Sequence, residues 1–152
     1  MSVTFDVDEG VDVPLAELRA AADSALDDSA TEELTVRITG DDFLQQLNRE
    51  HRGIDEPTDV LSFPATDDDF PDDEELDGYL GDIAISVPAA RRNSELTKTP
   101  IERELRHLVV HGVLHLLGFD HETDDDTVLM RAREVELLGD WVHAIWDAPP
   151  TH

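Results

Sequence analysis

Short stretches in which apolar and polar residues alternate predict four β-strands. Alternation places every second side chain on the same face of a sheet, and glycine or proline is expected to interrupt the pattern. The strands are predicted at residues 3–7, 34–38, 58–63 and 80–87. Gly40, Pro64 and Pro88 follow the last three of them.

Apolar residues three or four positions apart predict helices between and after these strands. Pro14 suits the first turn of one helix, Asp41 can cap another, and a short helix with Arg91 and Arg92 is expected after Pro88. The expected core-facing positions are Leu15, Leu18, Ala22 and Leu26 in the first helix, Phe43, Leu44 and Leu47 in the second, Ile101, Leu105, Leu108, Val109, Gly112 and Leu116 in a long helix, and Val128, Met130, Val135, Leu138, Val142 and Ile145 in a last helix over residues 128–145.

The start of the long helix has its own signal. Thr99-Pro100-Ile101-Glu102 has the pattern of a capping box, with proline expected at the first helical position. The order of all these elements indicates an α+β or mixed α/β fold, and we predict α+β, with about four strands in a mixed sheet packed with helices. No repeat or linker divides the chain, so a single domain over residues 1–152 is expected.

The composition is strongly acidic. The chain has 11 lysines and arginines against 37 aspartates and glutamates, which gives a formal net charge of −26. Such a chain repels itself in dilute buffer, whereas at molar salt the Debye length falls to about 3 Å. We therefore expect a host with a salt-rich cytoplasm. Because the chain has no cysteine, disulfides, thiolate metal sites and a thiol nucleophile are excluded.

The sequence also bears on location and partners. No apolar run approaches the roughly 18 residues that span a bilayer, and the first residues carry no secretory signal, so we expect a cytoplasmic protein without membrane contact. Seven of the eleven basic residues lie in two short segments, which are either candidate nucleic-acid contacts or solvated helix faces. These residues are Arg49 and Arg52 in one segment, and Arg91, Arg92, Lys98, Arg103 and Arg106 in the other.

Three histidines recur every four residues along the long helix: His107, His111 and His115. Residues four apart lie about 40° apart round the helix and about 6 Å apart along it. His111 and His115 can therefore point two imidazoles at one ion about 2.0–2.1 Å from each nitrogen. His107 lies about 12 Å from His115 along the axis. We expect it to pack in the core or to support a ligand rather than to bind the ion.

A third ligand is expected just after this helix. Gly118 is suited to the left-handed conformation that ends a helix, and the following turn can bring His121 back under the first two histidines. The predicted metal site therefore lies on one central helix and the turn after it, with His111, His115 and His121 as neutral nitrogen ligands. Three protein ligands leave a fourth position for water, which is typical of catalytic zinc.

The spacing His111-x-x-x-His115-x-x-Gly118-x-x-His121 matches that of the metzincin zinc proteases with one departure. Those proteases have a glutamate after the first histidine, and it acts as the general base on the zinc-bound water. Here that position is Gly112. The spacing therefore favours a metal site, and the missing carboxylate argues against ordinary peptide hydrolysis.

This segment and several others resemble stretches of the YbeY endoribonucleases, which are bacterial ribosomal-RNA maturation factors. The likeness extends over roughly residues 34–138. The matching stretches are His111-Gly112-Val113-Leu114-His115-Leu116-Leu117-Gly118-Phe119-Asp120-His121, Leu47-Asn48 with Arg52, Thr58-Asp59-Val60-Leu61-Ser62-Phe63-Pro64, Leu80-Gly81-Asp82-Ile83, and Met130 with Glu134.

The resemblance implies a zinc-dependent, single-strand-specific endoribonuclease with one Zn²⁺ per chain. It implies work in 3′-end maturation of small-subunit ribosomal RNA and in ribosome quality control. The family's metal ligands fall on His111, His115 and His121, and its functional arginine falls on Arg52. The expected partners are ribosomal RNA and the small ribosomal subunit, with ribosomal proteins and assembly GTPases as further candidates.

Three functions stay open on the residues alone. The first is this endoribonuclease, the second a metallohydrolase of another substrate class such as peptides, and the third a non-catalytic ribosome-assembly factor whose zinc only stabilises the fold. Arg52 can pair with phosphate through its fork of donors. Zinc-bound hydroxide or the RNA 2′-hydroxyl can be the nucleophile. Asp59 and Asp82 either orient ligands or shape the cleft, or have a structural role.

Overall fold

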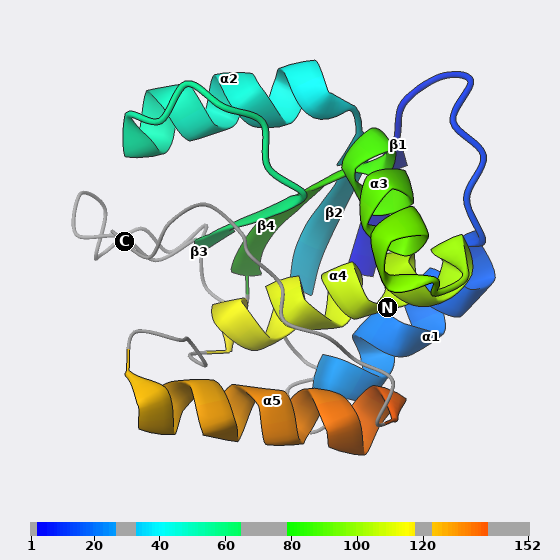
Figure 1. Ribbon diagram of the computed structural model, residues 1–152, viewed down its shortest axis with the longest axis vertical. Coiled ribbons are helices and arrows are strands. Elements are labelled where there is room, and N and C mark those ends of the chain that lie inside the picture. The colour runs from blue at the N-terminus through cyan, green and yellow to red at the C-terminus, as the bar shows by residue number, and fades with distance from the viewer. Residues whose placement is uncertain (1–2, 27–32, 65–78, 118–122, 140–152) are drawn as a thin grey trace.

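The computed structural model describes residues 3–26, 33–64, 79–117 and 123–139. The described chain forms four strands and five helices, which confirms the predicted α+β fold (Figure 1). In chain order these are β1 (Val3–Val7), α1 (Leu15–Leu26), β2 (Glu33–Thr39), α2 (Asp41–Arg52), β3 (Val60–Pro64), β4 (Tyr79–Ser86), α3 (Val87–Thr97), α4 (Ile101–Leu116) and α5 (Asp124–Leu138). Residues 66–77 and the predicted turn at Gly118 lie outside the described residues.

The sheet is mixed, as predicted. Its strand order is β1-β2-β4-β3; β1, β2 and β4 are parallel, and β3 runs antiparallel to β4. The last strand in the sequence thus lies between β2 and β3. Figure 1 shows α2 on one face of the sheet, and α4 and α1 on the other, with α5 packed beyond them.

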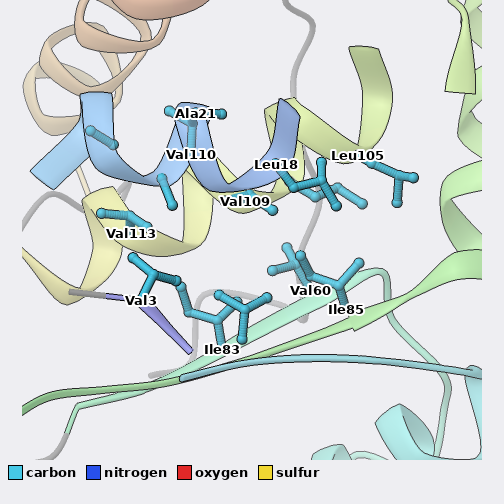
Figure 2. Packing of buried hydrophobic residues seen from close by; sticks show 14 of the residues in the cluster. Val3, Leu18, Ala21, Val60, Ile83, Ile85, Leu105, Val109, Val110 and Val113 are labelled. Atoms are coloured by element: carbon cyan, nitrogen blue, oxygen red, sulfur yellow. The ribbon is translucent and has the colours of Figure 1, made fainter. Parts of the chain in front are cut away.

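Alternation along the strands sends side chains to two cores. Ile83 and Ile85 of β4 join the large core under α1 and α4, while Ala84 joins Leu44 and Leu61 in a smaller core under α2. Figure 2 shows the large core, in which side chains of α1 and α4 meet those of the strands. Because β4 is covered on both faces, its run from Ile83 to Ile85 is buried throughout.

Helix α4 is the central helix of the protein. It contacts β3 and β4, and also α1, α3 and α5. The predicted core face is confirmed, since Leu105, Leu108, Val109 and Gly112 are buried. Side chains on the other faces are buried as well, including Glu104, His107 and His111. The site on this helix is therefore built inside the protein.

Two predicted helix caps are wrong. Gly40, not Asp41, is the N-cap residue of α2, and the Asp41 side chain instead accepts hydrogen bonds from Ser86 and Arg92. At the start of α4 the N-cap residue is Pro100, and no side chain caps the helix, so the predicted capping box does not form. The Asp41 side chain therefore bonds to residues distant in the sequence instead of capping α2. Helix α4 begins one residue later than the capping box predicts.

The last helix also differs from the prediction. It begins at Asp124, where the Thr123 side chain accepts a hydrogen bond from the Asp126 N–H, and it ends at Leu138. Gly139 has φ 121°, a left-handed value that favours glycine and stops the helix. Residues 140–145 of the predicted helix lie outside the described residues.

The buried face of α5 was also predicted incorrectly. Met130 is buried as expected, but Val128 and Val135 are exposed, and Glu134 takes a buried position beside Met130. In α1, Leu18, Ala22 and Leu26 are buried as predicted, whereas Leu15 is exposed. No helix in the described ranges has the length and hydropathy that a membrane-spanning helix requires.

Candidate metal centre

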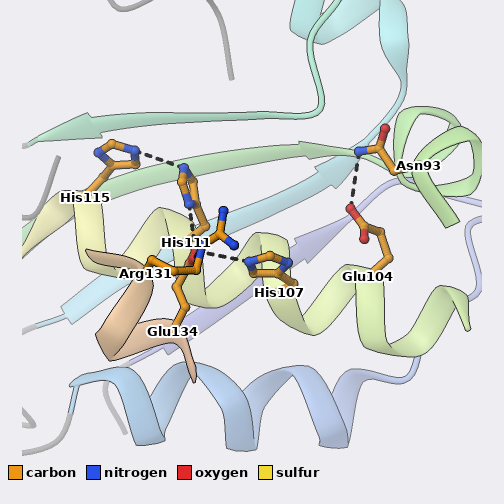
Figure 3. Close-up of polar contacts among 7 residues, drawn as sticks. All are labelled: Asn93, Glu104, His107, His111, His115, Arg131 and Glu134. Atoms are coloured by element: carbon orange, nitrogen blue, oxygen red, sulfur yellow. Dashed lines mark hydrogen bonds and ion pairs between the residues drawn. The ribbon is translucent and has the colours of Figure 1, made fainter. Parts of the chain in front are cut away.

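Two of the predicted ligands meet at the C-terminal half of α4. The Nε2 atoms of His111 and His115 lie 3.0 Å apart, and the two rings are nearly perpendicular (Figure 3). His111 is buried and His115 is partly exposed. The four-residue spacing therefore does what the sequence predicts: it directs two ring nitrogens to one point at the edge of the core.

The other ring nitrogen of His111 has a partner on α5. His111 Nδ1 lies 2.9 Å from Glu134 Oε2, and His107 Nε2 lies 3.1 Å from the same oxygen. The second carboxylate oxygen, Oε1, lies 3.6 Å from Arg131 Nε, one helical turn earlier on α5. Glu134 thus joins α5 to two histidines of α4, as Figure 3 shows.

The Glu134 carboxyl is ionised despite its position. Burial raises its pKa, but polar contacts with His107 and His111, together with their charge when protonated, lower it to about 2. A carboxylate accepts hydrogen bonds and donates none. His111 Nδ1 therefore donates its N–H to Glu134, whereas His107 Nε2 lies within ion-pair distance of the same oxygen without the geometry of a hydrogen bond.

The donor pair fits a zinc ion. Two ligands of a tetrahedral zinc with bonds of 2.0–2.1 Å lie roughly 3.3 Å apart, close to the 3.0 Å between the two Nε2 atoms. His121 lies outside the described residues. Among the residues that the structure does describe, no group of three candidate ligands is found. The described part of the site is therefore the His111–His115 pair with its Glu134 support.

Gly112 follows His111 on α4 and packs against Ile83 of the sheet. A Cβ atom at this position would lie 2.8 Å from Ile83 Cγ2 and 3.0 Å from Ile83 Cδ1. The Gly112 carbonyl accepts a hydrogen bond from Ser62 Oγ of β3 at 3.2 Å. Position 112 therefore faces the sheet. Glycine allows α4 to lie this close to β4, and a side chain here would enter the core.

The other predicted residues have different positions. Arg52 is the last residue of α2, and its side chain is not among the described ones. Asp82 is exposed and pairs in register with Phe63. Asp59, just before β3, is buried and accepts a hydrogen bond from Asn93 Nδ2 at 2.9 Å, which joins this residue to α3.

The C-terminal ends of α2 and α4 lie at the same side of the molecule, near the edge strand β3 (Figure 1). The ring of His51 on α2 contacts the ring of Phe63 on β3, with centroids 4.9 Å apart. Phe63 packs partly against the smaller core. The helix that ends in Arg52 and the helix with the His111–His115 pair are thus arranged near one strand.

Glu134 is the residue of this candidate site that pattern analysis from the residues missed. It stands four positions after Met130, so it occupies a core-facing position of α5 where an apolar residue is expected. A single acidic residue on such a face was the available signal, because buried carboxylates are rare unless they are paired. Its histidine partners, however, are on α4 and leave no trace in the spacing of α5.

Comparison with known proteins identifies the family of the chain. The family model described as Endoribonuclease YbeY matches residues 6–142. The chain belongs to the YbeY family. Endoribonuclease YbeY of Bradyrhizobium diazoefficiens is 46% identical over 123 residues, which are 78% of this chain and 66% of that protein. Endoribonuclease YbeY of Desulforamulus reducens is 42% identical over 70% of each chain.

A solved structure shares the fold of this YbeY family member. The solution structure of TM1509 from Thermotoga maritima has a TM-score of 0.57 and 25% identity, and the match covers 91% of each chain. The chain spans about two thirds of the length of the Bradyrhizobium relative. The predicted family resemblance is confirmed.

Proposed function

We propose that this chain is a zinc-dependent endoribonuclease that cleaves single-stranded RNA in the cytoplasm. Its proposed task is 3′-end maturation of small-subunit ribosomal RNA and ribosome quality control. The observation that carries the proposal is the pair of Nε2 atoms from His111 and His115, 3.0 Å apart and supported by Glu134. Membership of the YbeY family, whose relatives are named endoribonucleases, supplies the reaction class.

In this proposal His111, His115 and His121 hold one Zn²⁺. When bound, zinc polarises a phosphoryl oxygen and lowers the pKa of a bound water towards 7. The protein's own contribution is to orient the imidazoles and to bind the RNA backbone. Arg52 is proposed to bind a phosphate through its guanidinium fork and to offset the negative charge that develops during cleavage.

The proposed partners are ribosomal RNA and the small ribosomal subunit, together with ribosomal proteins or assembly GTPases. With a net charge of −26, the chain as a whole repels polyanions. Contact with RNA is therefore proposed to depend on a few local cations such as Arg52, and on protein surfaces of the ribosome rather than on long-range attraction.

Two alternatives are less well supported. Peptide hydrolysis of the metzincin type needs a carboxylate after the first histidine, but Gly112 faces Ile83 in the core. A purely structural metal is normally closed by four protein ligands, whereas the proposed set has three. The endoribonuclease is therefore the function that we propose.

The test compares substrates and metal states in high KCl. Single-stranded RNA, a duplex of the same sequence and casein are incubated with zinc-loaded protein and with protein treated with chelator. Cleavage of single-stranded RNA alone, lost with chelator and restored by zinc, is expected. Cleavage of casein without RNA cleavage would instead support the peptidase, and zinc binding without any cleavage would support the structural alternative.

Arg52 is tested against a matched control on the same helix. Arg52→Ala is expected to reduce RNA cleavage while zinc still binds. Arg49→Ala removes an equal charge from an exposed residue whose nearest described acidic partner is Asp55, at 3.7 Å, and should leave cleavage nearly unchanged. Equal losses in the two variants would mean that Arg52 contributes only general charge.

A further inference from the structure

We infer that Glu134 and His107 are positioning residues for the proposed metal ligand His111: they fix its ring with the proton on Nδ1, so that the lone pair is on Nε2, the nitrogen that faces His115. This inference deepens the proposed function and rests on it for the metal. It begins from one oxygen atom. Oε2 of Glu134 lies 2.9 Å from His111 Nδ1 and 3.1 Å from His107 Nε2.

The first step concerns the tautomer of His111. A neutral imidazole carries its single proton on either Nδ1 or Nε2. A carboxylate 2.9 Å from Nδ1 accepts a hydrogen bond and therefore stabilises the tautomer with the proton on Nδ1. The lone pair is then on Nε2, which is the nitrogen that faces His115. The carboxylate thus selects the tautomer that is able to bind a metal through Nε2.

The second step concerns how Glu134 itself is held. The His107 side chain is fully buried, and that of Glu134 is 4% exposed. His107 Nε2 lies at the oxygen that His111 also contacts, and Arg131 Nε lies 3.6 Å from the other oxygen. The carboxylate is therefore held at both oxygens by groups from α4 and α5. Its direction, and hence the direction of the His111 ring, is set by the packing of two helices.

The third step assigns His107 its role. It is too far along α4 to share an ion with His115, since eight residues span about 12 Å. A buried leucine would fill the same core position without the cost of placing a polar ring there. The imidazole places a ring nitrogen 3.1 Å from Glu134 Oε2, a polar contact that leucine could not make. His107 thus acts through Glu134 and not on the metal itself.

The inference is tested first on the metal-free protein. Two-bond ¹H–¹⁵N correlation spectra of the full chain in KCl at about pH 8, where an ordinary histidine is neutral, show which ring nitrogen of His111 carries the proton. The wild-type protein is expected to carry it on Nδ1. Glu134→Ala is expected to give a mixture of tautomers, and Glu134→Gln, which keeps an acceptor oxygen, is expected to retain Nδ1–H. A wild-type His111 with its proton on Nε2 would overturn the inference.

The second readout is affinity for Zn²⁺ and Co²⁺, measured by competition with a chromophoric chelator. Loss of a group that supports a ligand costs roughly 10–100-fold in metal affinity, and we expect this range for Glu134→Ala and a smaller loss for Glu134→Gln. His107→Leu is expected to weaken binding, whereas His107→Gln, which keeps an N–H donor, should restore most of it. The cobalt absorption spectrum should change in Glu134→Ala, because the direction of a ligand changes.

The matched control is Glu136→Gln. Glu136 lies two residues away on α5 with its side chain 68% exposed, and its ion pair is with Arg133. This variant should leave the tautomer and the metal affinity unchanged. If Glu134→Ala binds Co²⁺ as tightly as the control, the inference is wrong. If Glu134→Ala does not fold, the wild-type spectrum and the pair His107→Leu and His107→Gln still decide.

Failure of the inference and failure of the proposed function give different results. A wild-type protein with Nδ1–H on His111 that binds no zinc and cleaves no RNA would overturn the proposed function, while the effect of Glu134 on the tautomer would stand. A zinc-dependent ribonuclease whose tautomer and metal affinity ignore Glu134 and His107 would keep the proposed function and overturn the inference.

Discussion

The two ends of α4 each bury a carboxylate, but the partners differ. Near the N-terminal end, Asn93 Nδ2 of α3 donates to Glu104 Oε2 at 3.2 Å and to Asp59 Oδ2 at 2.9 Å. Further along α4, Glu134 of α5 contacts the rings of His107 and His111, and His111 in turn contacts the partly exposed His115 (Figure 3).

The difference shows what each partner adds. An amide that bridges two carboxylates fastens α3, α4 and the residue before β3 together. An imidazole has a second nitrogen, so a carboxylate on one side of the ring determines what the other side can bind. The amide cluster is therefore expected to affect stability, and the imidazole cluster to affect metal binding as well.

The largest expected effect is at the exposed end of the imidazole cluster. His115→Ala removes one of two proposed ligands whose Nε2 atoms lie 3.0 Å apart. RNA cleavage should fall by more than about 100-fold, beyond the cost of losing a supporting hydrogen bond, and zinc content should fall with it. Because His115 is partly exposed, the urea midpoint should change little. A folded, zinc-free variant with full activity would contradict the proposed role of the metal.

The next effect separates the clusters by stability. Asn93→Ala leaves the buried carboxylates of Asp59 and Glu104 without a donor that they share. An unmet hydrogen bond of this kind costs about 1–3 kcal/mol, so urea unfolding should show a loss in that range. Zinc affinity should stay within error of wild type. A drop in zinc affinity as large as that of Glu134→Ala would mean that the two ends of α4 are not independent.

A comparable effect is expected where α4 approaches the sheet beside the imidazole cluster. Gly112→Ala places a Cβ atom 2.8 Å from Ile83 Cγ2, and overpacking of this kind costs about 1–3 kcal/mol. Ile83→Ala should relieve part of the clash. In a double-mutant cycle the combined loss should therefore be smaller than the sum of the two single losses. Additive losses would show that the contact with Ile83 is not the cause of the destabilisation by Gly112→Ala.

The smallest effect concerns a carboxylate at the surface, which serves as a reference for the two buried clusters. Hydrogen bonds from Arg92 and then Ser86 lower the pKa of Asp41 below its ordinary value of 3.8, although burial raises it. A lowered folded-state pKa adds stability above pH 3.8 that is lost as the pH falls through the folded-state value. Asp41→Asn should flatten the stability curve below about pH 4, by no more than about 1 kcal/mol. An unchanged acid limb would show that the pair contributes nothing measurable.

The sequence predicted the parts that depend on local periodicity. Residues four apart on a helix must share a face, so the meeting of His111 and His115 followed from spacing alone, as did the burial of Leu105 and Leu108. Strand alternation located all four strands. The position of β4 between β2 and β3 was not predictable in this way, because strand order depends on long-range packing and not on local pattern.

Local signals failed where a tertiary partner competed. Asp41 is a residue type that often caps helices, but its side chain accepts hydrogen bonds from Ser86 and Arg92 instead of from the backbone of α2. Glu134 was known only from the family resemblance until α5 was seen to pack on α4. Val128 and Val135 were assigned to the core by their hydrophobicity, yet they are exposed, because the face of a helix that is buried is chosen by its neighbours.

The contact between Gly112 and Ile83 also limits how this fold can change. A glutamate introduced after the first histidine, in imitation of the zinc proteases, would point into packed hydrocarbon instead of towards solvent at the ligands. Such a conversion would first require a smaller residue in place of Ile83 on β4 and a shift of α4 away from the sheet. The packing of Gly112 against Ile83 therefore limits which reactions point mutations could introduce at these histidines.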